Sequence, residues 1–160
     1  MRIGILSDTH DRRERAARAV RMLVDSGAEA LFHCGDLTVP DIVFECTELP
    51  SYFVFGNNDD DEDGIRTAIS AIGGTCLDWG GEVVLGGRRI AMTHGDLGKE
   101  VRRLIAAAPD YLLFGHSHVP TDDREGPTRW INPGALHRAE AWTVALLDLD
   151  TDGLEFLKIR

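Results

Sequence analysis

Short apolar runs alternate with helix-like stretches over the first three-quarters of the chain, and each run ends in a cluster of polar residues. Short runs that are rich in aliphatic and aromatic side chains are typical of buried strands. The pattern predicts five such strands, over Ile3–Leu6, Ala30–Phe32, Tyr52–Phe55, Arg89–Met92 and Tyr111–Phe114.

Apolar residues recur with helical periodicity between several of these runs, which predicts amphipathic helices. The longest covers Arg12–Asp25 and places four apolar residues on one face: Ala16, Val20, Leu23 and Val24. Shorter helices are predicted over Val39–Cys46, Ile65–Ile72 and Lys99–Ala107. The acidic run Asp59–Asp63 is interpreted as a loop that leads into a helix.

Strands predominate in the remainder of the chain. Glycine pairs at Gly80-Gly81 and Gly86-Gly87 predict turns among strands in Thr75–Leu85 and Arg88–Met92. The pattern is β from Arg129 onward, and it ends in a hairpin of two strands around Asp152-Gly153, namely Trp142–Leu149 and Leu154–Ile159. This order of elements predicts an α/β fold with one mixed sheet or two stacked sheets.

The composition fits one globular domain that spans residues 1–160. Hydrophobic residues make up 43% of the chain, and no linker divides it. No apolar run reaches the roughly 18 residues of a membrane span and no secretion signal is visible, so we expect no membrane contact and a cytoplasmic location. Cys34, Cys46 and Cys76 form no Cys-x-x-Cys pair and are odd in number, which argues against a disulfide framework or a thiolate zinc site.

The formal net charge is −10, which repels nucleic-acid backbones, so we expect no surface for a nucleic-acid polymer. The cationic residues are 15 Arg and 2 Lys. Two explanations remain open for this balance: a surface adapted to a salty cytoplasm, and a GC-rich genome that favours Arg over Lys.

The polar clusters after the five apolar runs carry residues that bind metals. Ligands in open α/β sheets bind beyond the carboxyl ends of the strands, so these clusters are expected to converge. Two pairs of residues in these clusters, Asp8 with His10 and His116 with His118, are spaced i, i+2. Side chains with this spacing point the same way in extended chain, so each pair can reach one metal centre. The candidate ligands are Asp8, His10, Asp36, Asn57, His94, His116 and His118.

The mixture of imidazole, carboxylate and amide oxygen suits transition-metal ions such as Mn²⁺, Fe²⁺, Zn²⁺, Co²⁺ or Ni²⁺, with Mn²⁺ expected first. A site for Ca²⁺ or Mg²⁺ is built from oxygen atoms and would not need histidines. A structural zinc site closes with four ligands. Seven candidates are too many for one ion, and they suit two ions that share a bridging carboxylate.

Five motifs in a fixed order complete this picture: Asp8-Thr9-His10, Gly35-Asp36, Gly56-Asn57-Asn58-Asp59, His94-Gly95 and Gly115-His116-Ser117-His118. With them the chain resembles the calcineurin-like metallophosphoesterase superfamily, and its short length and Asn132-Pro133-Gly134 resemble the small YfcE-like phosphodiesterase branch. The resemblance implies a four-layer α/β/β/α sandwich in which helices flank two mixed sheets. It also implies a metal-dependent phosphoric ester hydrolase.

The resemblance assigns the ligands to two ions that share Asp36 as the bridge. The first ion would be held by Asp8, His10, Asp36 and His118, and the second by Asp36, Asn57, His94 and His116. A hydroxide between ions about 3.5–4 Å apart would then attack phosphorus in line with the leaving oxygen.

Further residues in or near these motifs also have expected roles. Many family members carry a histidine on the leaving-group side where this chain has Asn58, and Ala135 replaces a serine that is frequent in the branch. Asp59 and Asp96 are expected to support ligands or turns. His33 is expected to be a satisfied residue at a strand end, with an approach to the site as the alternative. His137 and Arg138 are expected in an exposed loop, with substrate contact as the alternative.

The expected substrate is a small phosphodiester, because the hydroxide-loaded site would keep a single positive charge. The alternatives are a phosphomonoesterase on the same site and a non-catalytic, protein-binding scaffold of the retromer-subunit type. The natural substrate, the physiological metal and the oligomeric state are left open.

Overall fold

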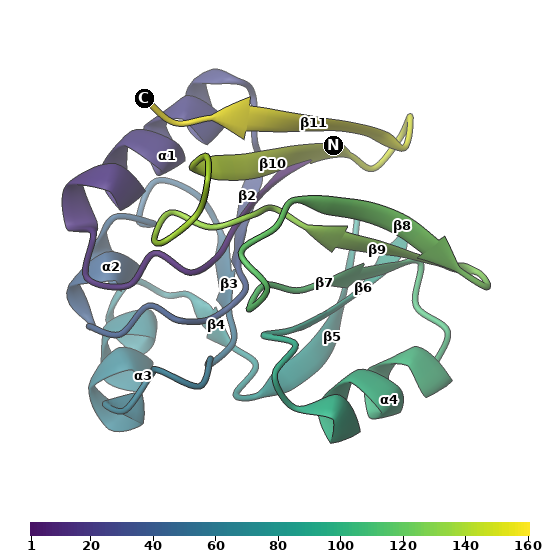
Figure 1. Cartoon of the computed structure of the whole chain (residues 1–160), viewed down its shortest axis with the longest axis horizontal. Helices are drawn as coiled ribbons and strands as arrows, with labels where there is room; N and C mark the ends of the chain where they lie inside the picture. Colours follow the sequence, from purple (N-terminus) through teal and green to yellow (C-terminus); the bar gives the residue numbers. More distant parts are fainter.

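Two mixed β-sheets pack face to face and carry helices on their outer faces in the computed structural model, which describes residues 1–160 (Figure 1). The helices are α1 (Arg13–Asp25), α2 (Asp41–Phe44), α3 (Glu62–Ala71) and α4 (Gly98–Ala106). In spatial order the first sheet contains β11 (Gly153–Lys158), β10 (Thr143–Asp148), β1 (Arg2–Leu6), β2 (Ala30–His33), β3 (Ser51–Phe53) and β4 (Thr75–Cys76). The second contains β5 (Gly80–Leu85), β6 (Arg88–Thr93), β7 (Tyr111–Leu113), β9 (Thr128–Asn132) and β8 (Thr121–Glu125). The predicted four-layer α/β/β/α architecture is confirmed.

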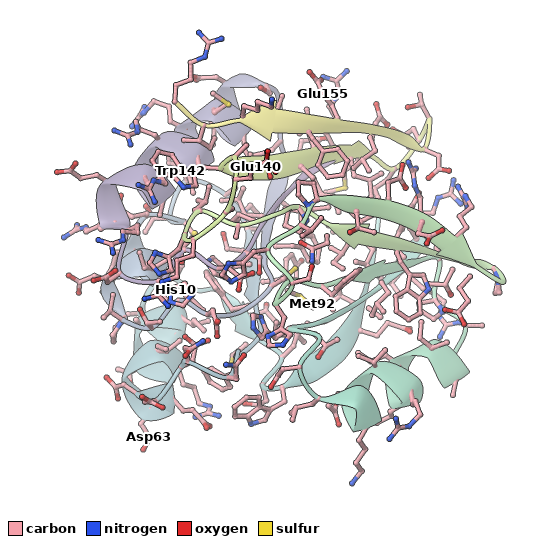
Figure 2. The ribbon with its side chains drawn as sticks, in the orientation of Figure 1. His10, Asp63, Met92, Glu140, Trp142 and Glu155 are labelled. Carbon is pink, nitrogen blue, oxygen red and sulfur yellow. The ribbon has the colours of Figure 1, made fainter.

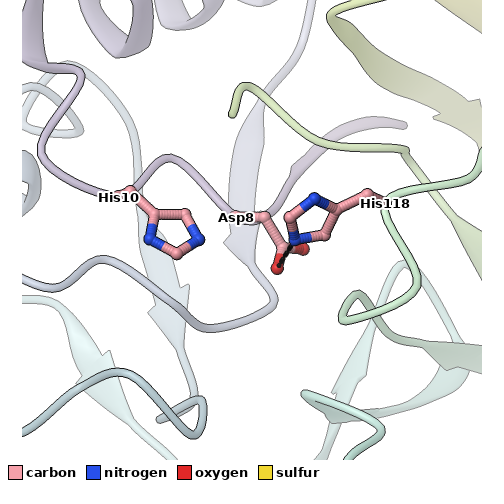
Figure 3. Close-up of side chains that lie close together, drawn as sticks. All are labelled: Asp8, His10 and His118. Atoms are coloured by element: carbon pink, nitrogen blue, oxygen red, sulfur yellow. Dashed lines mark ion pairs between the residues drawn. The ribbon is translucent and has the colours of Figure 1, made fainter. Parts of the chain in front are cut away.

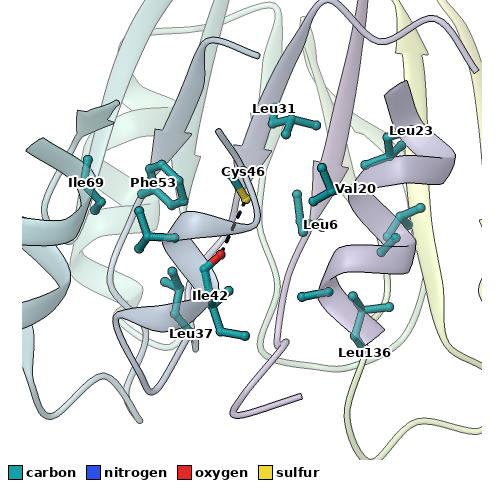
Figure 4. Packing of buried hydrophobic residues seen from close by; sticks show 14 of the residues in the cluster. Leu6, Val20, Leu23, Leu31, Leu37, Ile42, Cys46, Phe53, Ile69 and Leu136 are labelled. Atoms are coloured by element: carbon teal, nitrogen blue, oxygen red, sulfur yellow. Dashed lines mark hydrogen bonds between the residues drawn. The ribbon is translucent and has the colours of Figure 1, made fainter. Parts of the chain in front are cut away.

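Three hydrophobic clusters lie between the four layers. The largest has 20 buried residues and lies where α1, α2 and α3 cover the first sheet (Figure 4). A second cluster of 14 buried residues lies between the sheets and includes Met92, near the centre of the molecule (Figure 2). Leu31 joins the first cluster while its neighbours Ala30 and Phe32 join the second. Both faces of β2 are therefore buried, which explains the continuous apolar run in its sequence.

The central strands run in parallel within each sheet. In the first sheet β1 pairs in parallel with β2, and β2 with β3. In the second sheet β6 pairs in parallel with β7, and β7 with β9. The carboxyl ends of neighbouring parallel strands meet at one edge, so the loops that follow these six strands can build one site.

Some predicted boundaries were wrong. The helix α3 begins at Glu62 rather than Ile65, because the side chain of Asp61 caps it by accepting a hydrogen bond from the Gly64 backbone N–H at 3.0 Å. Part of the predicted acidic loop is thus helical, and acidic side chains in a first turn favour the helix dipole. The helix expected over Val39–Cys46 shrinks to Asp41–Phe44, as α2.

The strands show two further differences. Gly80 and Gly81 lie inside β5, and the chain turns just before them, at Asp78, whose φ is 53°. The edge strand β8 was not predicted, because its sequence is hydrophilic and mostly exposed. The Gly86-Gly87 turn and the hairpin of β10 and β11 are confirmed.

All three cysteines are free; Cys34 and Cys46 are buried, and Cys76 is half-buried. None of the four helices combines the length and the apolar character needed to cross a membrane.

The acidic composition leads to a prediction about salt. If the surface is tuned to high ionic strength, raising KCl from about 0.1 M to 1 M should raise the melting temperature by several degrees, because the Debye length falls from about 10 Å to 3 Å and repulsion among carboxylates weakens. Thermal melts across a KCl series test this, with 1 M sorbitol as a control without charge screening. A flat response would favour the GC-content explanation.

Candidate metal centre

The seven predicted ligands come together where the loops after the parallel strands of both sheets meet. The first sheet supplies four of them after β1, β2 and β3, and the second supplies three after β6 and β7. The members from the first sheet are Asp8, His10, Asp36 and Asn57, and those from the second are His94, His116 and His118. The sheet-edge argument from the sequence thus agrees with the arrangement in space.

One group of ligand atoms belongs to Asp8, His10 and His118, whose side chains face one another (Figure 3). Their ligand atoms all lie within 4.8 Å of one another. The shortest contact joins His118 Nε2 to Asp8 Oδ1 at 3.0 Å. This group contains three of the four residues that the family pattern assigns to the first ion.

A second group is formed by Asp8, Asp36 and His94, all of them buried. His94 Nε2 lies 3.4 Å from Asp36 Oδ2 and 3.9 Å from Asp8 Oδ1. The same Asp36 oxygen lies 3.6 Å from His10 Nε2, so it reaches a histidine on each side. Asp36 is therefore suitably placed for a bridge, and Asp8 also has atoms in both groups.

Asn57 and His116 extend the second group towards the surface. His116 Nδ1 lies 3.1 Å from Asn57 Oδ1, and its ring centroid is 5.2 Å from that of His94. Both residues are exposed. His116 therefore lies beside the second group, whereas His118 joins the first.

The sequence predicted that the two ligand pairs spaced i, i+2 lie in extended chain, and this prediction was wrong. Five of the seven predicted ligands have a left-handed backbone, with φ of 51° at Asp8, 47° at His10, 57° at Asp36, 67° at His116 and 60° at His118. Such a conformation costs a non-glycine residue roughly 1 kcal/mol or more, and strained residues of this kind cluster at functional sites.

Hydrogen bonds between loops hold this strained backbone in place. The backbone N–H of Asp8 donates to Gly35 O at 3.0 Å, and that of His10 donates to Asp36 O at 2.9 Å. In the second sheet, the Gly115 N–H donates to His94 O at 2.9 Å. A Cβ on Gly35 would lie 2.8 Å from His94 Nδ1, so this glycine allows the loops to approach each other.

The residues present fit divalent metal ions. Three buried ligand atoms lack any hydrogen-bond partner: Asp8 Oδ1, His10 Nε2 and His94 Nε2. Leaving buried polar atoms unpaired is costly, and ions would satisfy all three. The other ring nitrogen of His94 donates to Cys34 O at 2.8 Å, and His118 Nδ1 donates to Arg138 O at 3.3 Å. These bonds leave an Nε2 lone pair directed at the group, as in many metal sites.

Charges in this cluster shift two pKa values in opposite directions. Burial alone would raise the pKa of Asp36, but the adjacent His94 and two hydrogen bonds from Asn58 hold it well below its usual range. Burial alone would lower the pKa of His94, but Asp36 and Asp8 raise it to about 9. In the absence of ions, the carboxylates thus attract a proton to His94, which indicates a site that favours cations.

The sequence matches the family model of the calcineurin-like phosphoesterase superfamily domain over residues 1–152. The chain belongs to this superfamily. Membership confirms the predicted family and the predicted class of enzyme, a metal-dependent phosphoric ester hydrolase.

Individual relatives of this calcineurin-like phosphoesterase cover its whole length. The phosphodiesterase MJ0936 of Methanocaldococcus jannaschii is 26% identical over 163 residues, which cover 99% of this chain and 98% of that protein. The solved structure of a novel archaeal phosphodiesterase has a TM-score of 0.90 at 24% identity and covers 99% of this chain and 100% of its own. YfcE, a phosphoesterase from E. coli, has a TM-score of 0.71 at 20% identity, with 100% of both chains covered. The two structures share the fold.

Asp59 holds the loops of the candidate metal centre together, in keeping with its predicted role of supporting ligands or turns. Its side chain is 3% exposed and accepts three backbone hydrogen bonds. Oδ2 accepts from Asp36 N at 2.9 Å and from Gly56 N at 2.7 Å, while Oδ1 accepts from Thr38 N at 2.6 Å. One carboxylate thus joins the loop after β2 to the loop after β3.

Replacing Asp59 with Asn should loosen both loops, because an amide has one acceptor oxygen and its NH₂ would face a backbone N–H. We expect metal affinity to fall about 10–100-fold and the free energy of unfolding to fall by about 1–3 kcal/mol. Metal titration by calorimetry and urea unfolding measure the two effects. Asp60→Asn, at an exposed neighbour, is the matched control, and equal behaviour of both variants would contradict this role.

Other predicted residues have mixed outcomes. His33 is buried, with its Nε2 3.0 Å from Thr9 Oγ1, and burial lowers its pKa to about 3, so the ring is neutral. Its Nδ1 has no partner, so the predicted satisfied histidine is only half correct. Asp96 lies in a bend before α4, as expected.

The expectation of an exposed loop was wrong for His137. The residue is half-buried, and its ring centroid lies 4.3 Å from that of His10. Arg12 Nε donates to His137 Nδ1 at 3.5 Å. Arg138 itself is exposed, as predicted.

The sequence analysis gave no role to two supporting residues, Ser7 and Asn132. Ser7 Oγ donates to Asp8 Oδ2 at 2.6 Å, and the Asn132 side-chain N–H donates to Gly115 O at 2.8 Å. Both residues are fully buried. The signals in the sequence that could have indicated them are the position of Ser7 directly before Asp8-Thr9-His10 and that of Asn132 in Asn132-Pro133-Gly134.

Proposed function

We propose that the chain is a phosphodiesterase that uses two divalent transition-metal ions, with Mn²⁺ expected first, to hydrolyse a small phosphodiester. The observation that carries the proposal is the convergence of unpartnered, buried ligand atoms from Asp8, His10 and His94 beside Asp36 and His118. A mixed set of carboxylates and imidazoles at this spacing suits such ions.

The proposed ligand sets follow the family pattern. Asp8, His10, Asp36 and His118 would hold one ion, and Asp36, Asn57, His94 and His116 the other. When bound, the two ions would supply a hydroxide for in-line attack on phosphorus and would neutralise charge on the phosphoryl oxygens. The residues of the chain orient this chemistry: the Cys34 and Arg138 carbonyls fix the rings of His94 and His118, and Ser7 fixes Asp8.

Charge favours a diester over a monoester. Two ions bring four positive charges, while Asp8, Asp36 and a hydroxide bring three negative charges, which leaves one positive charge for substrate. A diester is a monoanion and matches this charge, whereas a monoester carries up to two negative charges. The phosphodiesterase name of the 26% identical MJ0936 supports the same preference.

A metal-by-substrate screen of the metal-free protein tests the proposal. Bis(4-nitrophenyl) phosphate and 4-nitrophenyl phosphate are offered with each of Mn²⁺, Fe²⁺, Zn²⁺, Co²⁺ and Ni²⁺. We expect the diester to give the higher kcat/KM with at least one metal. A preference for the monoester would favour a phosphomonoesterase, and metal binding without any turnover would favour a scaffold.

Asn58 distinguishes this chain from many members of its family on the proposed leaving-group side. Its side-chain NH₂ donates to Asp36 Oδ2 at 2.7 Å and its backbone N–H donates to Asp36 Oδ1 at 2.9 Å. An amide can donate hydrogen bonds but cannot release a proton near neutral pH. Asn58 would thus orient the bridging carboxylate and leave the departing oxygen without an acid.

Without a general acid, the rate should fall steeply as the leaving-group pKa rises, since general acid catalysis contributes roughly 10²–10⁴-fold. Nitrophenyl diesters should react readily and alkyl diesters far more slowly. Asn58→His should flatten this dependence and help poor leaving groups most. The wild type and Asn58→His are compared on a series of aryl and alkyl diesters, and the metal content of each protein is measured. Parallel slopes would show that this position does not govern leaving-group departure.

A further inference from the structure

The largest hollow on the surface lies away from the metal ligands, between α1, β11 and the segment 139–142. Its volume is about 830 Å³. We refer to it as the α1–β11 groove, with Arg18, Met22, Trp142, Phe156, Lys158 and Arg160 among its lining residues. Figure 2 shows Trp142 and Glu140, two of the lining residues, near α1 and β10. None of its lining residues belongs to the five motifs of the metal centre.

A second hollow lies beside the groove and includes one of the predicted metal ligands. It has a volume of about 560 Å³, and His118 and Arg138 are among its lining residues. It shares Lys158 and the segment 139–141 with the α1–β11 groove. Since His118 is a predicted ligand, a molecule that reacts at the metal centre could extend through this hollow into the groove.

Cationic side chains without an ion-pair partner gather here. Nine of the 17 Arg and Lys residues form ion pairs with carboxylates, which leaves eight that do not. Five of these eight line the two hollows or contact their wall: Arg15, Arg18, Arg138, Lys158 and Arg160. Glu140 is the one acidic residue in either lining. On a chain with a net charge of −10, this region therefore carries a local excess of positive charge.

The groove also offers an apolar, aromatic surface. Phe156 is 37% exposed there, and Met22 and Trp142 are half-buried. The guanidinium of Arg15 lies 3.3 Å from the centroid of the Trp142 ring and donates a hydrogen bond to Leu136 O. This cation–π contact fixes the indole in the groove wall. A rigid aromatic wall beside unpaired cations suits an aromatic group that carries negative charge.

We propose that the α1–β11 groove binds the non-reacting ester substituent of the substrate, and that this substituent is aromatic and carries a second negative charge. This inference rests on the proposed phosphodiesterase function and names a substrate class for it. The phosphodiester would lie at the metal centre, its second substituent would pass His118 and Arg138, and its ring and anionic group would meet Trp142, Arg18 and Lys158.

Two synthetic diesters with the same 4-nitrophenyl leaving group test the class: one carries phenyl and the other 4-carboxyphenyl as the second substituent. For the wild type we expect KM about fivefold lower for the carboxyphenyl ester at similar kcat, because exposed ion pairs contribute up to about 1 kcal/mol. Arg18→Glu and Lys158→Glu should each remove most of this difference. Arg21→Glu, on the same helix but outside the groove, should retain it.

A binding measurement separates this proposal from the proposed function. The probe is 4-carboxyphenyl phenyl phosphate, titrated calorimetrically into the metal-free protein, where no hydrolysis is needed. Binding that is weakened about fivefold by Arg18→Glu and not by Arg21→Glu supports the groove even if no diester is ever hydrolysed. In that case the phosphodiesterase function fails and the groove remains a site for aromatic anions.

Two results would overturn the proposal. One is hydrolysis of both diesters with equal KM values that Arg18→Glu and Lys158→Glu do not change; the phosphodiesterase function would then stand without the groove. The other is a concentration-dependent dimer that Phe156→Glu dissociates in sedimentation experiments. That outcome would assign this face to a second copy of the chain.

Discussion

Asp36→Asn is expected to lower kcat/KM for a nitrophenyl phosphodiester by roughly 10²–10⁴-fold, because removing one partner from a buried charged group costs about 3–5 kcal/mol and each 1.36 kcal/mol is tenfold. Asp36 is 2% exposed, and its Oδ2 lies within 3.6 Å of both His10 Nε2 and His94 Nε2. No other carboxylate oxygen lies this close to a histidine on each side. An amide in its place would remove the charge that holds both proposed ions.

The metal-induced rise in melting temperature provides a reading that is independent of turnover, since a ligand that binds the folded state stabilises it in proportion to the logarithm of its concentration over Kd. Asp36→Asn should lose most of this rise. Asp96→Asn, at a carboxylate close in sequence to His94 but without a contact in the centre, should keep it. Full activity in wild-type enzyme that holds one ion or none by elemental analysis would refute the two-ion proposal.

Gly115→Ala is expected to disrupt the centre through packing alone. A Cβ at this position would lie 1.9 Å from Ser7 Oγ and 2.7 Å from Asp8 Oδ2. Overpacking of this kind costs about 1–3 kcal/mol or more, and a displacement of about 1 Å at a reacting centre can cost 10²-fold in rate. Activity assays and thermal melts should therefore both show a loss, with a fall in melting temperature of roughly 3–10 °C.

The double variant Ser7→Gly/Gly115→Ala provides the matching control, because Ser7→Gly removes the Ser7 atoms that the new methyl group would meet and leaves only the close approach to Asp8 Oδ2. We expect it to recover part of the stability lost in Gly115→Ala, although Ser7→Gly alone is destabilising. Additive losses in this cycle would show that the collision is relieved elsewhere in the loop.

The fold could be predicted from the sequence wherever burial leaves a periodic pattern. The strands β1 and β2 are buried on both faces and therefore read as continuous apolar runs. By contrast, β8 is an exposed edge strand of sequence Thr-Asp-Asp-Arg-Glu, and no hydrophobic alternation distinguishes it from a loop. The start of α3 depends on the cap at Asp61. The sequence does not show which residue of the acidic run Asp59–Asp63 is the cap.

The residues of the candidate site could be predicted better than their geometry. Polar side chains after parallel strands are expected at one edge, and this argument selected the residues that form both ligand groups. The left-handed backbone at His116 could not be foreseen, because its N–H donates to Asp8 Oδ2 at 3.1 Å, on a loop that is distant in the sequence. The approach of His137 to His10 has the same origin, since it depends on how segments 127 residues apart pack together.

The left-handed backbone at five of the predicted ligands sets up a trade-off between stability and activity. Asn is tolerated better than most residues in this conformation and Gly adopts it without strain, so an exchange to Gly at His10, His116 or His118 would relax the backbone while it removes a ligand. A descendant that no longer needed the ions would gain stability from the very mutations that destroy the centre. Loss of catalysis in such a lineage should thus be rapid and hard to reverse, and it would leave an intact sandwich free to acquire another role.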